Sequence, residues 1–256
     1  MIRVLMARIR QKHRTMKFPA GNPPPLPEAY RGRIELSPDK CTPACAKCAG
    51  VCPTAAVSAD TSATNNRVTV DLGKCLFCGQ CESACPARAI AHARDYRLAA
   101  RRREDLVTTG NEFALAKSLE GEMRRLLGRS LKLRQVSAGG CNACEADVNV
   151  LGTVGWDLGR FGIQFVASPR HADGLLITGP VTQNMQLALK KTYDAVPRPK
   201  IVIAVGACAI SGGPFAGSAP AGQGADTHVP VDLYIPGCPP HPLTILDGLL
   251  RLIGRL

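Results

Sequence analysis

Twelve cysteines are the residues of this chain whose type and spacing could do chemistry. Eight of them fall between residues 41 and 85, and the other four are spread over the second half of the chain. The chain opens without the uninterrupted apolar core of a signal peptide, so we expect a cytoplasmic protein whose thiols stay reduced. Thiolates in such a protein serve mainly as metal ligands or reactive groups. The spacing of the cysteines therefore decides which chemistry is predicted.

The first eight cysteines form two similar runs. The second run has the pattern C-x2-C-x2-C-x3-C-P and consists of Cys75, Cys78, Cys81, Cys85 and Pro86. The first run consists of Cys41, Cys45, Cys48, Cys52 and Pro53. Its last three cysteines lie 33 residues before their counterparts, whereas the first lies 34 before its counterpart. The two runs are thus an internal repeat, with one extra residue in the loop after Cys41.

This repeat resembles the two-cluster [4Fe–4S] ferredoxin domain over residues 36–95. In that domain three close cysteines hold one cluster, and the fourth, before the proline, ligates the other cluster. The first cluster would then be held by Cys41, Cys45, Cys48 and Cys85. The second would be held by Cys75, Cys78, Cys81 and Cys52. A zinc ribbon is the alternative, but zinc sites usually join two C-x2-C pairs and do not explain triplets. The extra residue after Cys41 either bulges harmlessly or loosens that ligand.

The remaining cysteines each follow a predicted strand. Short apolar runs lie at residues 131–136, 163–167, 174–178, 201–205 and 231–235. Segments of crossover length separate them, which predicts a flavodoxin-like, doubly wound parallel sheet after the ferredoxin-like α+β domain. Ligands of such sheets bind beyond the carboxyl ends of the strands. We therefore expect a third [4Fe–4S] cluster on Cys141, Cys144, Cys208 and Cys238. Scattered structural cysteines are the alternative.

Composition divides the chain into four parts. Residues 1–35 form a basic arm with a proline-rich spacer, and residues 36–95 form the two-cluster domain. Residues 96–130 are expected to form a helical linker, with a helix over residues 111–127, and residues 131–256 form the third-cluster domain. In the arm, apolar residues recur at helical spacing at Ile2, Leu5, Met6 and Ile9. This spacing predicts a short amphipathic helix that either docks on a membrane or stays solvated.

Several function classes are excluded by what the sequence lacks. The formal charge of +12 suggests nucleic-acid binding, but aromatic residues make up only 4% and offer no platform for stacking bases. The sequence contains no run of 18 apolar residues, so we expect no transmembrane helix. It also contains no G-x-G-x-x-G, Walker or H-E-x-x-H motif. We expect neither a nucleic-acid partner nor a catalytic residue within this chain.

Four segments of the second half together resemble one protein family. They are the segments 141–145 (CNACE), 168–173 (SPRHAD), 206–213 (GACAISGG) and 235–240 (IPGCPP). The family is the small, cluster-bearing subunit of membrane-bound [NiFe] hydrogenases and formate hydrogenlyase, which includes the homologous subunit of complex I. The first half, with its arm, resembles the two-cluster ferredoxin-like subunit of the same complexes. Both appear fused in this chain.

The resemblance implies an electron-transfer subunit of a membrane-associated oxidoreductase complex of the hydrogenase type. Three [4Fe–4S] clusters would relay electrons to or from a catalytic large subunit. Membrane subunits would contact the N-terminal arm and hold the protein at the inner face of the cell membrane. Two residues separate Cys141 from Cys144, as in the hydrogenase subunits, whereas the complex I subunits have adjacent cysteines. The alternative is a nickel-free, complex I-like NADH/quinone or ion-pumping oxidoreductase. Candidates for tuning or proton transfer near the third cluster are Glu145, Arg170 and His171.

Overall fold

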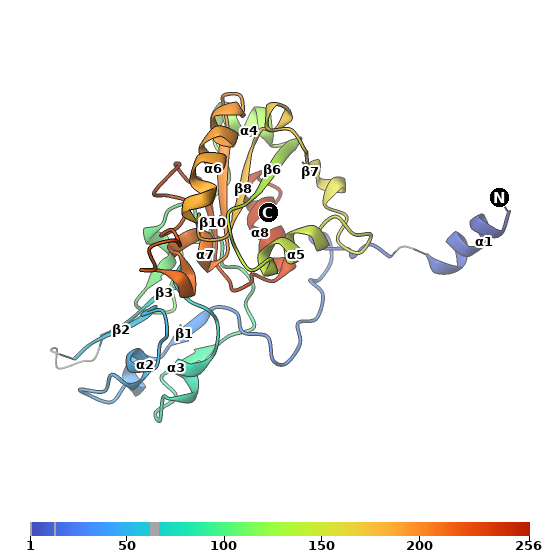
Figure 1. The fold of residues 1–256 in the computed structure, drawn as a ribbon. Helices are drawn as coiled ribbons and strands as arrows, with labels where there is room; N and C mark the ends of the chain where they lie inside the picture. Colours follow the sequence, from blue (N-terminus) through green and yellow to red (C-terminus); the bar gives the residue numbers. More distant parts are fainter. Residues whose placement is uncertain (1, 13, 62–66) are drawn as a thin grey trace.

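The computed structural model describes residues 2–12, 14–61 and 67–256. Met1, His13 and residues 62–66 lie outside the described part, so those positions of the predicted arm and ferredoxin domain are not considered further. An α/β region formed by residues 131–256 carries the cysteine region (residues 36–95) at one end of its sheet (Figure 1). Helix α1 (Ile2–Gln11) stands away from both.

Five parallel strands form the sheet of the α/β region. They are β6 (Leu131–Ser137), β7 (Ile163–Phe165), β8 (Gly174–Thr178), β9 (Ile201–Val205) and β10 (Leu233–Ile235). Their spatial order is β7-β6-β8-β9-β10, which in chain order is 2-1-3-4-5. This is the flavodoxin-like, doubly wound order, and it confirms the predicted fold class. The strands run parallel, so their carboxyl ends meet at one edge of the sheet.

Helices cover both faces of this sheet. One face carries α5 (Ala143–Val150) and α8 (Pro242–Leu252), and the other carries α6 (Gln183–Ala195) and α7 (Ala207–Ser211) (Figure 1). Alternate strand residues serve the two faces: Leu176 and Ile203 pack with α8 residues, whereas Ile177 and Val202 pack with residues of α6 and α7. Burying each such side chain contributes about 1.5–3 kcal/mol. The strands are apolar throughout because neither face meets water.

The cysteine region repeats its secondary structure as well as its cysteines. Its elements are β1 (Ile34–Leu36), α2 (Lys47–Gly50), β2 (Val57–Asp60), β3 (Arg67–Asp71), α3 (Gln80–Ser83) and β4 (Ile90–His92). Strand β1 pairs antiparallel with β4, and β2 pairs antiparallel with β3. Even the left-handed backbone repeats, with φ of 58° at Ala44 and 53° at Phe77, 33 residues later. The two halves are therefore equivalent in backbone conformation around each cysteine run.

The extra residue of the first run is absorbed inside one loop. Ile34 pairs with His92, and Val68 pairs with Ala59. Val68 follows Ile34 by 34 residues, whereas Ala59 precedes His92 by 33, so the two ladders match once one residue is inserted in the loop after Cys41. The strand register is unchanged on both sides of that loop. The insertion is a local bulge and does not shift the sheet.

The predicted linker differs from the structure. Residues 111–127 are helical only over α4 (Gly121–Leu127), so the expected long helix is wrong over its first ten residues. Tertiary hydrogen bonds hold this stretch extended: Leu36 N donates to the Asn111 side chain, and Ala116 N donates to Ala99 O. Upstream, β5 (Val107–Thr108) adds a third strand to β3. Short 3-10 turns complete the chain at Pro38–Lys40, Glu104–Leu106, Leu158–Phe161, Pro169–His171 and Gly213–Phe215.

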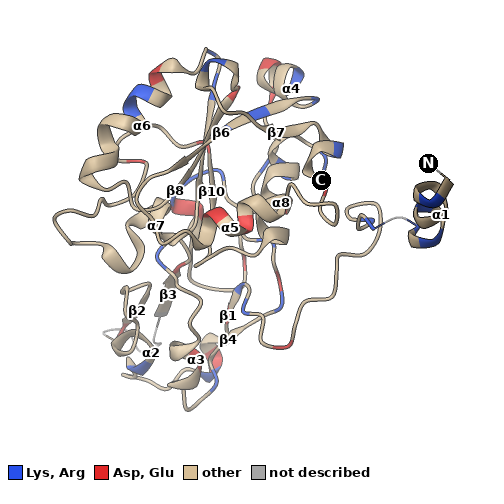
Figure 2. Cartoon of the chain, turned by 45° about the vertical axis from the view of Figure 1, so that its right-hand side comes forward, with Lys and Arg blue, Asp and Glu red and all other residues tan. Residues whose placement is uncertain are grey.

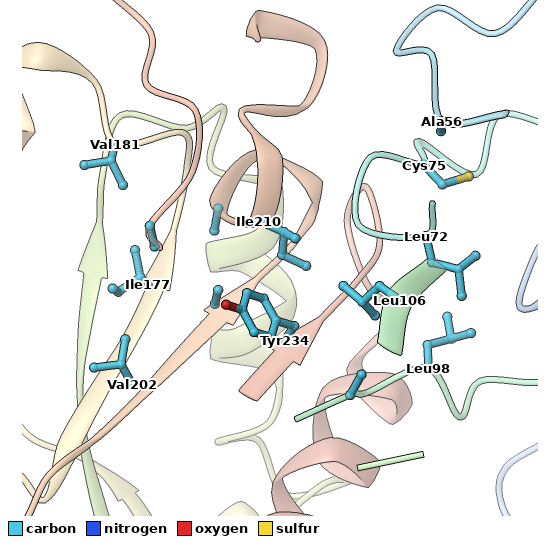
Figure 3. Packing of buried hydrophobic residues seen from close by; sticks show 14 of the residues in the cluster. Ala56, Leu72, Cys75, Leu98, Leu106, Ile177, Val181, Val202, Ile210 and Tyr234 are labelled. Carbon is cyan, nitrogen blue, oxygen red and sulfur yellow. The ribbon is translucent and has the colours of Figure 1, made fainter. Parts of the chain in front are cut away.

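A continuous apolar cluster joins the cysteine region to the α/β region. Leu72 and Leu106 from the side of β3 and β5 belong to the same cluster as Ile210 and Tyr234 of the α/β region (Figure 3). Ala100 also forms a two-bond antiparallel bridge with Tyr234 at the edge of the large sheet. Nothing in the described ranges is a helix long and apolar enough to cross a membrane.

Candidate cluster-binding sites

Cys41, Cys45, Cys48 and Cys85 line one pocket of the cysteine region, called the first pocket below. Cys85 comes from the second cysteine run, so the pocket joins both halves of the repeat. Its Sγ accepts a hydrogen bond of 3.2 Å from the backbone N–H of Ala89. Burial raises the pKa of the Cys48 thiol, and the nearby thiols of Cys85 and Cys41 raise it further. The extra loop residue leaves Cys41 in the lining of this pocket.

The second pocket is lined by Cys52, Cys75, Cys78 and Cys81, together with His92. Cys52 Sγ accepts a 3.2 Å hydrogen bond from Ala56 N, the same contact that Cys85 makes 33 residues later. Cys75 Sγ accepts a 3.3 Å bond from Phe77 N. Burial, with the nearby thiols of Cys81, Cys52 and Cys78, raises the pKa of Cys75 to about 12. The structure thus brings each trailing cysteine to the triplet of the other run.

The third group of thiols lies at the carboxyl ends of the parallel strands, and is called the third site. Cys141 and Cys144 follow β6, Cys208 lies in α7 after β9, and Cys238 follows β10. Burial raises the pKa of the Cys144 thiol, as do the thiols of the other three. Burial and the Cys238 and Cys141 thiols raise the pKa of Cys208 to about 11. Three loops that are distant in sequence therefore deliver four thiols to one edge of the sheet.

Two glycines keep room for the thiols of the third site. Gly206 has φ of +90°, and a Cβ added to it would lie 2.5 Å from Cys144 Sγ. A Cβ on Gly213 would lie 2.9 Å from Cys208 Sγ. Real Cβ atoms do not approach sulfur so closely, so larger residues there would displace the thiols. Glycine is required at Gly206 by both the left-handed backbone and the contact.

Glu145 is buried directly behind the third site. Its Oε1 accepts hydrogen bonds from Ser137 Oγ at 2.6 Å and from Thr178 Oγ1 at 2.7 Å. Ser137 ends β6 and Thr178 ends β8, so the carboxylate lies where the chain order of the sheet reverses. Ligands of doubly wound sheets bind at this switch point. The carboxylate also contributes to the raised thiol pKa values of Cys144 and Cys208.

Arg170 and His171 are not brought to the third site. Both lie in the 3-10 turn that precedes β8, at its amino end. The cysteines lie beyond the carboxyl ends of β6, β9 and β10, and β8 spans about 15 Å between those two edges. The expectation that His171 lies near the third cluster is therefore wrong. The segment instead supports the sheet, since Asp173 accepts a 2.7 Å bond from Lys132 N.

The three thiol groups follow one another through the molecule. Burial and the thiols of Cys78, Cys52 and Cys48 raise the pKa of Cys81 to about 11, so Cys81 is close to the first pocket through Cys48. The pKa of Cys238 is raised by burial and by the thiols of Cys141 and Cys78, so the third site is close to the second pocket through Cys78. The order is first pocket, second pocket, third site.

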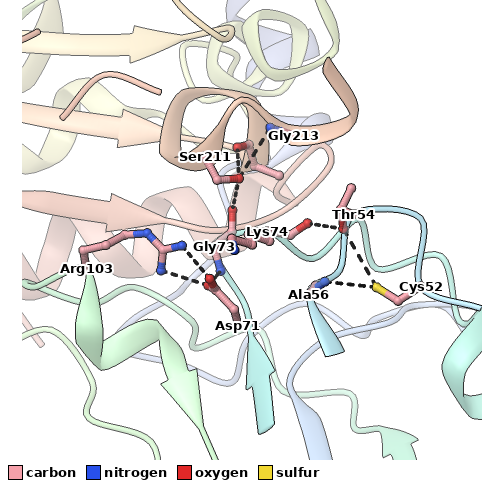
Figure 4. A network of polar contacts seen from close by, with 10 residues as sticks. Cys52, Thr54, Ala56, Asp71, Gly73, Lys74, Arg103, Ser211 and Gly213 are labelled. Carbon is pink, nitrogen blue, oxygen red and sulfur yellow. Dashed lines mark hydrogen bonds and ion pairs between the residues drawn. The ribbon is translucent and has the colours of Figure 1, made fainter. Parts of the chain in front are cut away.

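A polar network holds the second pocket against the third site (Figure 4). Ser211 Oγ, three residues after Cys208, donates to Gly73 O at 3.0 Å. Arg103 donates two hydrogen bonds to the Asp71 carboxylate, at 2.8 and 2.6 Å. Bidentate pairs of this kind fix geometry as well as adding energy. The turn before Cys75 is thereby tied to helix α7.

These surroundings suit iron–sulfur clusters better than single ions. Within the described part of the chain, no three His, Cys, Asp or Glu side chains are grouped closely enough to hold one metal ion. In a cubane cluster each thiolate binds a different iron, so the four sulfurs stand farther apart than ligands of one ion. The N–H···S bonds to Cys52, Cys75 and Cys85 are the contacts that stabilise cluster thiolates. Binding iron requires each thiol to lose its proton.

Sequence reasoning did not identify His92 as a site residue. It is the last residue of β4 and lines the second pocket. A signal was present, because His92 follows the trailing cysteine Cys85 by seven residues on the strand that returns to the cluster. Ser211 and Arg103 were also missed, since nothing in the sequence shows which loops of the two regions meet.

Comparison with known proteins relates the two regions to separate families. The family model "NADH ubiquinone oxidoreductase, 20 Kd subunit" matches residues 141–252, and "4Fe-4S dicluster domain" matches residues 33–99. A probable membrane-bound hydrogenase subunit of Pyrococcus furiosus is 39% identical over 150 residues, covering 59% of this chain and 90% of that protein. An NADH-quinone oxidoreductase subunit of Clostridium beijerinckii is 48% identical over 118 residues, covering 46% and 70%. Formate hydrogenlyase subunit 7 of Escherichia coli is 42% identical over 139 residues, covering 54% of each chain.

Proposed function

Because this chain belongs to the family of the 20-kDa subunit of NADH:ubiquinone oxidoreductase and carries a [4Fe–4S] dicluster domain, we propose that it conducts electrons through three [4Fe–4S] clusters. It is an iron–sulfur subunit of an oxidoreductase complex. A [4Fe–4S] cluster accepts and releases one electron at a potential set by its surroundings. The substrate chemistry takes place in a partner, the catalytic large subunit.

The linear order of the three thiol groups carries this proposal. The first cluster is assigned to Cys41, Cys45, Cys48 and Cys85, and the second to Cys75, Cys78, Cys81 and Cys52. The third is assigned to Cys141, Cys144, Cys208 and Cys238. Cys48 and Cys81 connect the first pocket to the second, and Cys78 and Cys238 connect the second to the third site. Such a series has one entrance and one exit, as an electron relay requires.

The exit of the relay is the third site. Cys141 and Cys238 are exposed, whereas Cys208 is buried. A partner that covers the two exposed thiols would exclude water from the site and approach it directly. We place the catalytic large subunit on this face, and an electron donor at the first pocket.

The large subunit is proposed to be of the nickel–iron hydrogenase type. The support is the two-residue gap between Cys141 and Cys144, the spacing of the hydrogenase subunits. Asn142 occupies that gap with φ of +69°, and α5 begins directly after it. A nickel-free, quinone-reducing complex is the second candidate, since a subunit of an NADH-quinone oxidoreductase is also among the relatives.

Nickel content and hydrogen-dependent dye reduction of the intact, purified complex separate these candidates. We expect stoichiometric nickel and hydrogen-dependent activity, lost in Cys144→Ser because electrons can no longer leave through the third site. A nickel-free complex that reduces quinone would exclude the hydrogenase assignment. The electron-relay role would then stand with a different acceptor.

Attachment to the membrane is proposed to involve α1. Apolar side chains at Ile2, Leu5, Met6 and Ile9 fall on one side of this helix and are exposed. Its charged residues are all basic (Figure 2). Helices of this kind bind anionic lipid surfaces by apolar burial and charge attraction. Together with membrane subunits, α1 would hold the protein at the inner face of the cell membrane.

A further inference from the structure

One nitrogen of the buried His92 side chain has no partner among the described residues. The side chain is 2% exposed and lines the second pocket beside its four thiols. Its Nδ1 lies 2.8 Å from Oε2 of Glu82. Nε2 is buried and makes no hydrogen bond within the described ranges. Leaving a buried ring nitrogen unpaired is unfavourable, so an unmatched group of this kind calls for a ligand that the protein itself does not supply.

We propose that His92 donates its Nε2 hydrogen to a sulfur atom of the cluster in the second pocket and thereby makes that cluster easier to reduce. The Glu82 carboxylate accepts the Nδ1 hydrogen and fixes the plane of the ring, as carboxylates do for histidines at metal sites. Hydrogen bonds to cluster sulfur stabilise the more negative, reduced state. This inference deepens the proposed function and rests on it, because it requires a cluster in that pocket.

The repeat shows that this pair is specific to the second pocket. The residues 33 positions before His92 and Glu82 are Ala59 and Ala49. Neither alanine can donate or accept a side-chain hydrogen bond, although the backbone of the two halves is equivalent. The same asymmetry distinguishes the potentials of the two ferredoxin-type clusters. It places the more easily reduced cluster next to the third site, where an electron arriving from the first pocket would come to rest.

Substitution of His92 in the full-length chain with its clusters tests the proposal. In His92→Leu, we expect the equilibrium constant for one-electron reduction of one cluster to fall about tenfold, a shift of about 59 mV to more negative potential. In His92→Gln the amide N–H replaces the donor and should restore most of the change. His228→Leu, which removes an exposed histidine, is the control and should change no potential. The measurement is a redox titration monitored by electron paramagnetic resonance.

A spectroscopic measurement keeps the test decisive if His92→Leu fails to hold the cluster. In wild-type protein labelled with 15N-histidine, pulsed electron paramagnetic resonance of the reduced protein should detect a nitrogen coupling that disappears in His92→Gln. A full set of clusters with no such difference, or an unshifted potential in His92→Leu, would overturn the proposal. Absence of iron and acid-labile sulfide from the wild-type protein would instead overturn the proposed function.

Discussion

Individual thiols in this chain differ in exposure, and the difference suits a relay. Cys48, Cys75, Cys81 and Cys208 are buried, whereas Cys78, Cys141 and Cys238 are exposed. Buried thiols with raised pKa values remain protonated at neutral pH until a metal displaces the proton. The exposed Cys78 and Cys238 lie close together at the junction of the two regions. Electrons can therefore leave the buried part of each site through its exposed thiol.

The assignment of trailing cysteines to the opposite cluster predicts how pairs of substitutions combine. Cys45→Ala with Cys85→Ala removes two ligands of one cluster and should leave about eight irons per chain. Cys81→Ala with Cys85→Ala removes one ligand from each of two clusters and should leave about four. Iron analysis after anaerobic reconstitution measures both. The reverse ranking of the two double variants would show that each run holds its own cluster.

Removing the charge of Glu145 should make the third cluster easier to reduce. Glu145→Gln keeps an oxygen that can accept from Ser137 and Thr178, so the fold should survive. The lost repulsion is about 1–2 kcal/mol, which corresponds to about 40–90 mV toward positive potential. A redox titration of the third cluster measures it, with Asp173→Asn at the opposite end of β8 as the control. An unchanged potential in Glu145→Gln would mean that the side chain only braces β6 against β8.

At the scale of elements, regular patterns could be predicted and tertiary effects could not. The five apolar runs all became parallel strands, because strands buried on both faces must be apolar. The helix expected over residues 111–127 was wrong because Asn111 and Ala116 bond to distant backbone, which outweighs local helix propensity. His171 was misplaced because a resemblance identifies a segment but does not tell which end of a strand it occupies.

Helix α1 should bind anionic lipid through one side only. Leu5→Asp with Ile9→Asp places two charges within the apolar stripe and should weaken sedimentation of the full-length protein with phosphatidylserine-containing vesicles about tenfold or more. Val4→Asp adds a charge outside the stripe and should have a much smaller effect. Raising the salt concentration should weaken binding of all three proteins. Equal loss in Val4→Asp would indicate attraction by net charge alone, without burial of the stripe.

For the whole molecule, one core and one junction fix the order of the sites. Leu72, Leu106, Ile210 and Tyr234 share an apolar cluster, so the two regions pack as one body there. The contacts of Ser211 with Gly73 and of Arg103 with Asp71 set how the turn before Cys75 meets α7. Cysteine spacing predicted each group of four thiols, but not which groups adjoin. That order depends on docking between surfaces whose residues carry no periodic signal.

Metal and sulfide analysis of the anaerobically prepared, full-length protein tests the relay most directly. Three clusters predict about twelve irons and about twelve acid-labile sulfides per chain, with magnetic interaction between neighbouring reduced clusters. Cys208→Ala should lower the iron content by about four and leave the two ferredoxin-type signals in place. Zinc in place of iron, with no acid-labile sulfide, would contradict the account.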